Sequence, residues 1–218
     1  MSGGERLYRC EDPAVWRGVY AKYWAVVEAK AAGKQKSSGR LLELEKWYQE
    51  ELPAAILTRT ERSLTHSELV KLMEWKTTRG KFRPRLKQLI GSNDDEAVLR
   101  CTKKAFALLP SVLAAGAPGE AAFMADEAVE SIAELRPVRY TAKHYSLFLE
   151  KILRKTHRLN EADSQQDWTP HKVELCLWAC AVANQIQPSL LEAFPLSYNT
   201  EAQEEETGGA PSKRRKTK

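Results

Sequence analysis

The sequence predicts an all-α protein, an irregular multi-helix bundle, from three observations. Apolar residues recur at the three- and four-residue spacing of amphipathic helices, and capping residues stand before these runs. No run shows sustained alternation of apolar and polar residues, so no β-sheet is expected. After residue 197 the apolar periodicity is lost, and such a segment cannot offset its ordering entropy. We therefore expect one helical domain over residues 1–197 and a disordered tail over residues 198–218.

Caps and breakers define the helices at the N-terminal end. Asp12 caps an amphipathic helix over residues 13–33, in which proline takes the favoured first position. The polar residues 33–39 follow as a mobile linker. Residues 40–52 then form a second helix, which stops around Pro53.

Two further helices are predicted in the middle of the chain. Thr65 and Glu68 have the T-x-x-E spacing of a capping box and open a helix that ends at Gly80. Pro84 is placed to begin a second, shorter helix, which continues through Ile90. The two helices are therefore expected to be separated by a short turn.

The second half of the chain contains five more predicted elements. An acidic SNDDE run caps the next helix, and residues 111–119 form an apolar segment broken by a turn. Residues 126–134 are expected to be helical, and Thr141 and Thr169 open the last two helices. The buried face of the helix after SNDDE is predicted to consist of Val98, Cys101, Ala105 and Leu109.

The densest functional signal is the basic stretch KLMEWKTTRGKFRPRLKQLI, which contains only one acid, Glu74. Its bases form a candidate nucleic-acid-binding stripe, and free amides at a helix start at Pro84 would help to hold a phosphate. Trp75 and Phe82 are candidates for stacking on bases. The alternative is a solvated basic face with both aromatics in the core. The candidate phosphate-binding bases are Lys71, Lys76, Arg79, Lys81, Arg83, Arg85 and Lys87.

A second basic cluster lies in the tail. The formal net charge of the chain is +5, which permits anionic partners without requiring them. A run of four bases in a disordered setting is typical of nuclear import signals, so we expect a nuclear protein recognised by an import receptor. A non-specific nucleic-acid patch or a solubilising end is the alternative. The cluster consists of Lys213, Arg214, Arg215 and Lys216.

Several classes of protein are not indicated. No apolar leader or membrane-spanning run is present, so a soluble, non-secreted protein without a membrane partner is expected. Cys176 and Cys180 share a helical face near His171, but no second Cys/His pair accompanies them, so they are interpreted as core cysteines and no metal is predicted. No nucleophile-elbow or P-loop pattern occurs, and no cofactor is expected.

One stretch resembles a known family. VLAAGAPGEAAFMADEAVESI is similar to the segment that follows the hairpin in helix-hairpin-helix DNA glycosylases. In that family the aspartate at this place is catalytic, so the resemblance implies a catalytic role for Asp126. EWKTTRGKFRPRLKQLI and RPVRYTAKHYSLFLEKI also resemble uncharacterised eukaryotic helical proteins that look related to these glycosylases, which extends the resemblance over about residues 64–187.

The chain departs from that family at the hairpin itself. The glycine-rich turn between two short helices has no counterpart, because KKAFALLPS runs directly into VLAAGA. Either the chain is a shortened form that lacks the hairpin, or the resemblance does not extend to function. An ordinary helix N-cap is the preferred interpretation of Asp126.

Three hypotheses about function follow. The first is a nuclear, non-catalytic helical protein that binds DNA or RNA through the basic stretch. The second is a DNA glycosylase-like repair protein, or its truncated inactive form, in which Asp126 assists the departure of a base. The third is a protein-interaction scaffold whose docking surface is the aromatic face formed by Trp16, Tyr20 and Trp24.

Overall fold

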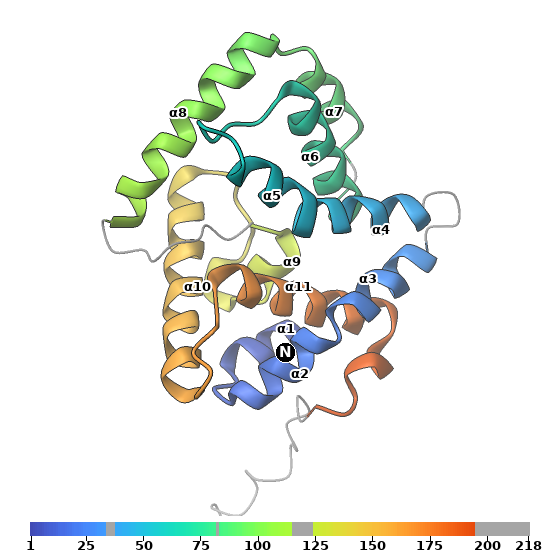
Figure 1. Ribbon diagram of the computed structural model, residues 1–218. Coiled ribbons are helices and arrows are strands. Elements are labelled where there is room, and N and C mark those ends of the chain that lie inside the picture. The colour runs from blue at the N-terminus through green and yellow to red at the C-terminus, as the bar shows by residue number, and fades with distance from the viewer. Residues whose placement is uncertain (34–37, 82, 115–123, 195–218) are drawn as a thin grey trace, which may run out of the picture.

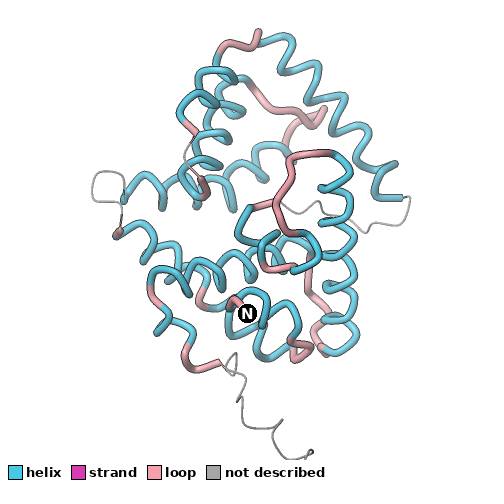
Figure 2. The backbone as a smooth tube through the Cα atoms, turned by 180° about the vertical axis from the view of Figure 1, so that it is seen from behind, coloured by secondary structure: helices cyan, strands magenta, loops and turns pink. Residues whose placement is uncertain are grey.

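The computed structural model of the 218-residue chain describes residues 1–33, 38–81, 83–114 and 124–194. These residues form helices and loops without a β-strand, as Figures 1 and 2 show, so the predicted all-α fold is confirmed over this part of the chain. None of the helices in these ranges is both long and apolar enough to cross a membrane. The elements are α1 (Gly3–Arg9), α2 (Pro13–Ala21), α3 (Tyr23–Ala32), α4 (Ser38–Lys46), a π-helical turn η1 (Trp47–Glu51), α5 (Leu52–Leu57), α6 (His66–Arg79), α7 (Pro84–Gly91), α8 (Asp95–Ala114), α9 (Asp126–Glu130), a 3₁₀ turn η2 (Ala133–Leu135), α10 (Ala142–Ala162), α11 (Pro170–Ile186) and a 3₁₀ turn η3 (Pro188–Leu191).

Four of the predicted N-caps are in place, those of Asp12, Thr65, Thr141 and Thr169. The Asp12 carboxylate accepts a hydrogen bond from the amide of Ala14 at the start of α2. Thr65 and Glu68 form the reciprocal capping box at the start of α6. The hydroxyls of Thr141 and Thr169 cap α10 and α11 by accepting from amides three residues further on. These local bonds satisfy amides that have no partner within a helix, which explains why the starts of these helices are predictable.

Several predicted boundaries at the N-terminal end are wrong. The helix expected over residues 13–33 is divided at Lys22 into α2 and α3. Pro53 does not stop the second helix, because it lies in the first turn of α5, where a missing N–H is tolerated. The π-helical turn before it closes with a bond from the Leu52 amide to the Trp47 carbonyl. Within the predicted linker 33–39, residues 34–37 lie outside the described part.

The prediction for α8 is wrong in its buried face. Val98 is buried, but Cys101 and Ala105 are exposed, because α8 packs mainly against α6 on one side. The side chain of Leu109 lies outside the described residues. The helix also continues to Ala114, through the start of the segment where a break was expected. The helix expected over residues 126–134 is instead α9 followed by the 3₁₀ turn η2.

The main core surrounds α11. This helix crosses the middle of the molecule in Figure 1 and packs against α1, α2, α3, α9 and α10. Its residues are apolar on nearly every side, the pattern of a helix buried all round. Cys176 and Cys180 lie in this core, which confirms their interpretation as core cysteines, and burial raises the pKa of both thiols. A smaller cluster centred on Trp47, Leu52 and Leu64 packs beneath α6 and α8.

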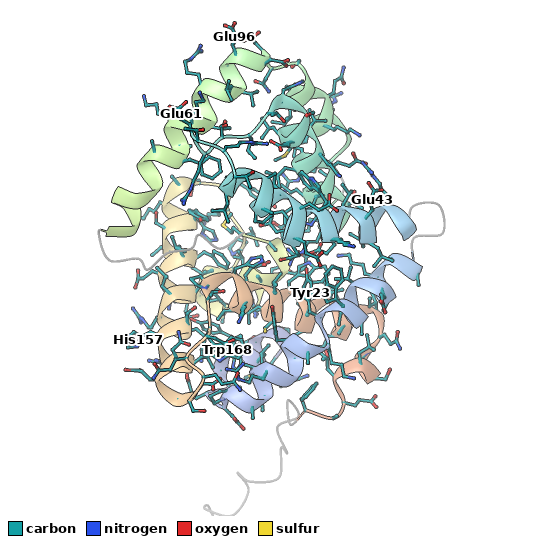
Figure 3. The ribbon with its side chains drawn as sticks, viewed as in Figure 1. Tyr23, Glu43, Glu61, Glu96, His157 and Trp168 are labelled. Carbon is teal, nitrogen blue, oxygen red and sulfur yellow. The ribbon has the colours of Figure 1, made fainter. Side chains whose placement is uncertain are left out.

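A buried ion pair joins α6 to α11. The Arg79 guanidinium at the end of α6 donates to both carboxylate oxygens of Glu174 at 3.0 and 3.3 Å. Its Nε lies 3.9 Å from the Glu45 carboxylate of α4, which accepts from the phenol of Tyr23 and the indole of Trp75. Figure 3 labels Tyr23, which points into the molecule from α3. The end of α6 is thereby fixed against the central helix.

Candidate nucleic-acid interface

The turn between α6 and α7 presents the basic stretch to solvent. Gly80 ends α6, and its amide donates to the Lys76 carbonyl at 3.0 Å. Arg83 is the N-cap residue of α7, and Pro84 follows at the first helical position. No side chain caps the first amides of α7. The helix start predicted at Pro84 is therefore present, with cations on both sides of it.

Four of the seven candidate bases are exposed, namely Lys81, Arg83, Arg85 and Lys87. We call these four residues the basic turn. Among the described residues, no carboxylate lies within ion-pair distance of Arg83 or Arg85. Lys87 contacts the Glu74 carboxylate at 3.1 Å, and Arg40 holds the same carboxylate at 2.7 Å. The Arg40 hydrogen bond is the main reason that the pKa of Glu74 falls to about 2, so Glu74 is ionised at neutral pH.

Two other bases are only partly accessible. The Lys71 ammonium lies over the ring of Trp47, 4.7 Å from its centroid, and 4.0 Å from the Glu43 carboxylate. Lys76 is half-buried beside the turn, and burial, followed by repulsion from Arg83, lowers its pKa. Both residues therefore lie at the edge of the exposed basic surface.

Arg79 and Trp75 do not belong to the surface, so their assignment as nucleic-acid contacts is wrong. Arg79 is buried because its guanidinium pairs with Glu174 and lies over the Trp178 ring, 4.3 Å from the centroid. Trp75 is buried because its ring stacks on Tyr48 at 3.6 Å between centroids. Phe82, the other stacking candidate, lies outside the described residues.

Asp126 lies beside the basic turn, although 45 residues separate it from Lys81 in sequence. One of its carboxylate oxygens lies 3.1 Å from the Lys81 ammonium, and both accept from the Tyr140 phenol at 2.7 Å. Its side chain is 11% exposed. Ala125 is the N-cap residue of α9, so the interpretation of Asp126 as an N-cap is wrong. The carboxylate instead turns toward the side chains across the cleft.

These side chains line a small cleft formed by the end of α6, the start of α7, α9 and the residues before α10. Its volume is about 30 Å³, far smaller than that of an ordinary small-molecule site. A shallower depression of about 680 Å³ adjoins it, because Lys81, Glu127 and Tyr140 line both. The depression has the volume of an ordinary small-molecule site, whereas the cleft does not.

The charges in the cleft reinforce one another. The hydrogen bond to the Asp126 carboxylate raises the pKa of Lys81, so its ammonium is charged at neutral pH. Burial, and then the same carboxylate, raises the pKa of Tyr140, so its phenol keeps the proton that it donates. Arg83 lies over the Tyr140 ring, 4.5 Å from the centroid. The exposed edge of the cleft therefore carries two cations and an aromatic ring.

Tyr140 was not among the predicted site residues. Its only sequence signal is its position directly before Thr141, the N-cap residue of α10. That position gives no indication that Arg83 and Asp126 approach it. Such contacts join three segments that are distant in sequence.

The predicted aromatic docking face is not intact. Trp16 is fully buried, where its indole donates to the Cys10 carbonyl, so its assignment to a docking surface is wrong. Tyr20 and Trp24 remain 38% and 41% exposed. Each makes an edge contact with a neighbouring ring, Tyr20 with Trp168 and Trp24 with Tyr23. Two partly exposed aromatics are left where three were expected.

Comparison with known proteins gives no relative. No family model, no curated protein and no solved structure matches the chain. The resemblance to helix-hairpin-helix glycosylases therefore stays a prediction, and the basic cluster at residues 213–216 lies outside the described part. The candidate site is defined by its own geometry, in which Lys81 and Arg83 of the basic turn meet Asp126 at one cleft.

Proposed function

We propose that this protein binds nucleic acid through the basic turn. The observation that supports the proposal is that four exposed cations stand within seven residues around the start of α7, where the N-cap residue Arg83 makes no side-chain capping bond. Phosphate groups are attracted to such a group of cations at a helix start. Arg79 is buried and does not belong to this surface, so the proposed contact includes fewer basic residues than the sequence predicts.

The salt dependence of binding tests the proposal. Each phosphate contact contributes roughly 0.7–0.9 to the slope of log affinity against log salt concentration. If all four cations contact phosphate, the slope is about −3 to −4. Titration of fluorescent duplex and single-stranded oligonucleotides at several salt concentrations measures it.

A charge-reversal variant identifies the surface. Changing Lys81, Arg83 and Arg85 to Glu should abolish binding, because three attractive contacts become repulsive. The matched control reverses three equally exposed bases elsewhere and should retain most of the affinity. The control bases are Arg9, Arg154 and Arg158. Equal affinity of the Lys81/Arg83/Arg85 variant and the unaltered protein would refute the proposal.

A second candidate function is base excision, which the position of Asp126 in the cleft favours over a capping role. A base must leave the stack and enter a pocket for this chemistry. The cleft is too small for a base, so it would have to open. Release of bases from a panel of damaged duplexes, eliminated in Asp126→Asn, would support this function. No release from any duplex would reject it.

We further propose that the protein is nuclear. The support is the run of four bases at residues 213–216, which an import receptor would recognise. A fusion to a reporter too large to diffuse into the nucleus should accumulate there. Replacing the four bases by Ala should return the fusion to the cytoplasm, and nuclear accumulation without them would reject the proposal.

A further inference from the structure

Tyr140 is the most exposed Phe, Trp or Tyr among the described residues. The residue is 54% exposed, compared with 41% for Trp24. The ring lies between the Arg83 guanidinium, 4.5 Å from its centroid, and the Asp126 carboxylate, which holds its hydroxyl. The hydroxyl bond fixes the orientation of the ring while the ring itself faces solvent. A fixed, exposed ring beside cations is the arrangement on which proteins stack nucleic-acid bases.

Space for a base lies next to this ring. The depression of about 680 Å³ begins at Lys81 and Tyr140 and continues past Arg136, Asn184 and Gln185. Asn184 and Gln185 provide amide hydrogen-bond donors there, and Arg136 is held by Glu5 and by the Glu130 carbonyl. A volume of this order accommodates a nucleoside, whereas the cleft on the side of Asp126 does not. The ring therefore borders the larger of the two spaces.

The two cations at the ring have weak internal partners. The Lys81 side chain is 61% exposed where it contacts the Asp126 carboxylate at 3.1 Å and the Glu130 carboxylate at 3.7 Å. Arg83 is exposed and has the Tyr140 ring as its neighbour. Because both cations are open to solvent these contacts are weak, although the Asp126 side chain itself is largely buried, and a phosphate can take over both cations. Asp126 is then a competitor for the lysine that a phosphate needs.

We propose that the depression beside Tyr140 binds a single-stranded nucleic acid, with one base stacked on the Tyr140 ring and the adjoining phosphates on Lys81 and Arg83. This inference rests on the proposed function and specifies its ligand. A single strand is required because the bases of a duplex are already stacked on their neighbours and cannot present a face to the ring. Asp126 opposes binding by holding Lys81 in the unbound protein.

The Tyr140→Leu variant tests the stacking step. Binding is measured with a twelve-nucleotide deoxythymidine strand and with a mixed-sequence duplex of twelve base pairs. Loss of the ring should weaken binding to the single strand by roughly 5- to 150-fold, the range of base–aromatic stacking, and should leave duplex binding unchanged. Tyr140→Phe keeps the ring and loses the hydroxyl bond that orients it, so it should lose less affinity for the single strand than Tyr140→Leu does.

The Asp126→Asn variant tests the competition for Lys81. Removing the carboxylate should strengthen single-strand binding by roughly two- to fivefold, the range of an exposed ion pair. Glu127→Gln is the matched control, because Glu127 lines the same cleft and lies near Lys30 rather than Lys81. Its effect should be smaller. Unchanged or weaker binding by Asp126→Asn would overturn the role assigned to Asp126.

The outcomes separate this inference from the proposed function. If the unaltered protein binds both ligands and Tyr140→Leu changes both equally or neither, stacking on Tyr140 is wrong and the basic turn remains a nucleic-acid surface. If the unaltered protein binds neither ligand, the proposed function is wrong and this inference fails with it. Selective loss of single-strand binding in Tyr140→Leu supports both.

Discussion

Replacing Arg79 by Met should destabilise the protein strongly, because Glu45 and Glu174 then lie buried without the cation that they share. The Arg79 guanidinium makes two hydrogen bonds to Glu174 and approaches Glu45 at 3.9 Å in a fully buried setting. Breaking a buried ion pair by removing one partner costs about 3–5 kcal/mol. Whole domains of this kind are stable by about 5–15 kcal/mol, so the loss is a large share of the total.

The partner substitution Glu174→Gln should cost much less at neutral pH. Burial raises the pKa of Glu174 to about 7, against the opposing attraction of Arg79, so its carboxyl already binds a proton readily. The neutral amide keeps the shape of that carboxyl and leaves Arg79 beside the Glu45 carboxylate. We expect a loss of about 1 kcal/mol or less. The double variant Arg79→Met/Glu174→Gln should recover part of the stability that Arg79→Met loses.

Urea unfolding followed by tryptophan fluorescence and circular dichroism measures these differences. The unfolding midpoints at pH 7 should rank the unaltered protein first, Glu174→Gln close behind, the double variant next and Arg79→Met last. An Arg79→Met midpoint equal to that of the unaltered protein would refute the reasoning. A loss of stability in Glu174→Gln as large as that in Arg79→Met would also refute it, because removing the cation would then cost no more than removing the carboxyl.

Three further predictions concern stability. Burial, and then Arg79, lowers the pKa of His171 to about 4, so the folded state excludes a proton that the unfolded state binds below pH 6.5. In urea titrations, the unaltered protein should therefore lose about 2 kcal/mol more stability between pH 7 and pH 5 than His171→Gln does. Equal losses in the two proteins would contradict this. Thr65→Ala should cost about 1 kcal/mol by removing the capping box of α6, whereas Thr60→Ala at an exposed bend should leave the unfolding midpoint nearly unchanged. Gly4→Ala should cost about 1–3 kcal/mol, because the added carbon would lie 2.0 Å from the buried Ser131 hydroxyl. At an exposed helix position the same substitution stabilises, so a gain of stability here would show that α1 can move away from α9.

Local signals explain what was predictable from the sequence. The starts of α6, α10 and α11 were predicted because their caps lie within three residues of the amides that they bond. The same S-x-x-E spacing at Ser2 and Glu5 would have indicated α1, which was not predicted. Helix starts are therefore properties of short segments, and a short segment is sufficient to recognise them.

The candidate site could not be predicted in full, because it is formed by contacts between segments that are distant in sequence. Arg79 was assigned to the surface by its charge, but it lies four residues after Trp75 and seven after Leu72, on the inward face of α6. Its partner Glu174 lies 95 residues away and cannot be inferred from that spacing. The meeting of Arg83, Asp126 and Tyr140 likewise depends on how three segments pack. Charge alone could identify the basic stretch but not which of its residues reach solvent.

The change from Arg79 to Lys81 across a single glycine has a consequence for how this protein can vary. Arg79 holds the fold together from inside, whereas Lys81 and the bases that follow face solvent and contribute little to stability. Substitutions after Gly80 can therefore change the charge of this surface without destabilising the core beneath it. The residues at 81, 83, 85 and 87 could be exchanged together, by design or by natural selection, while Arg79 and its partners stay constant.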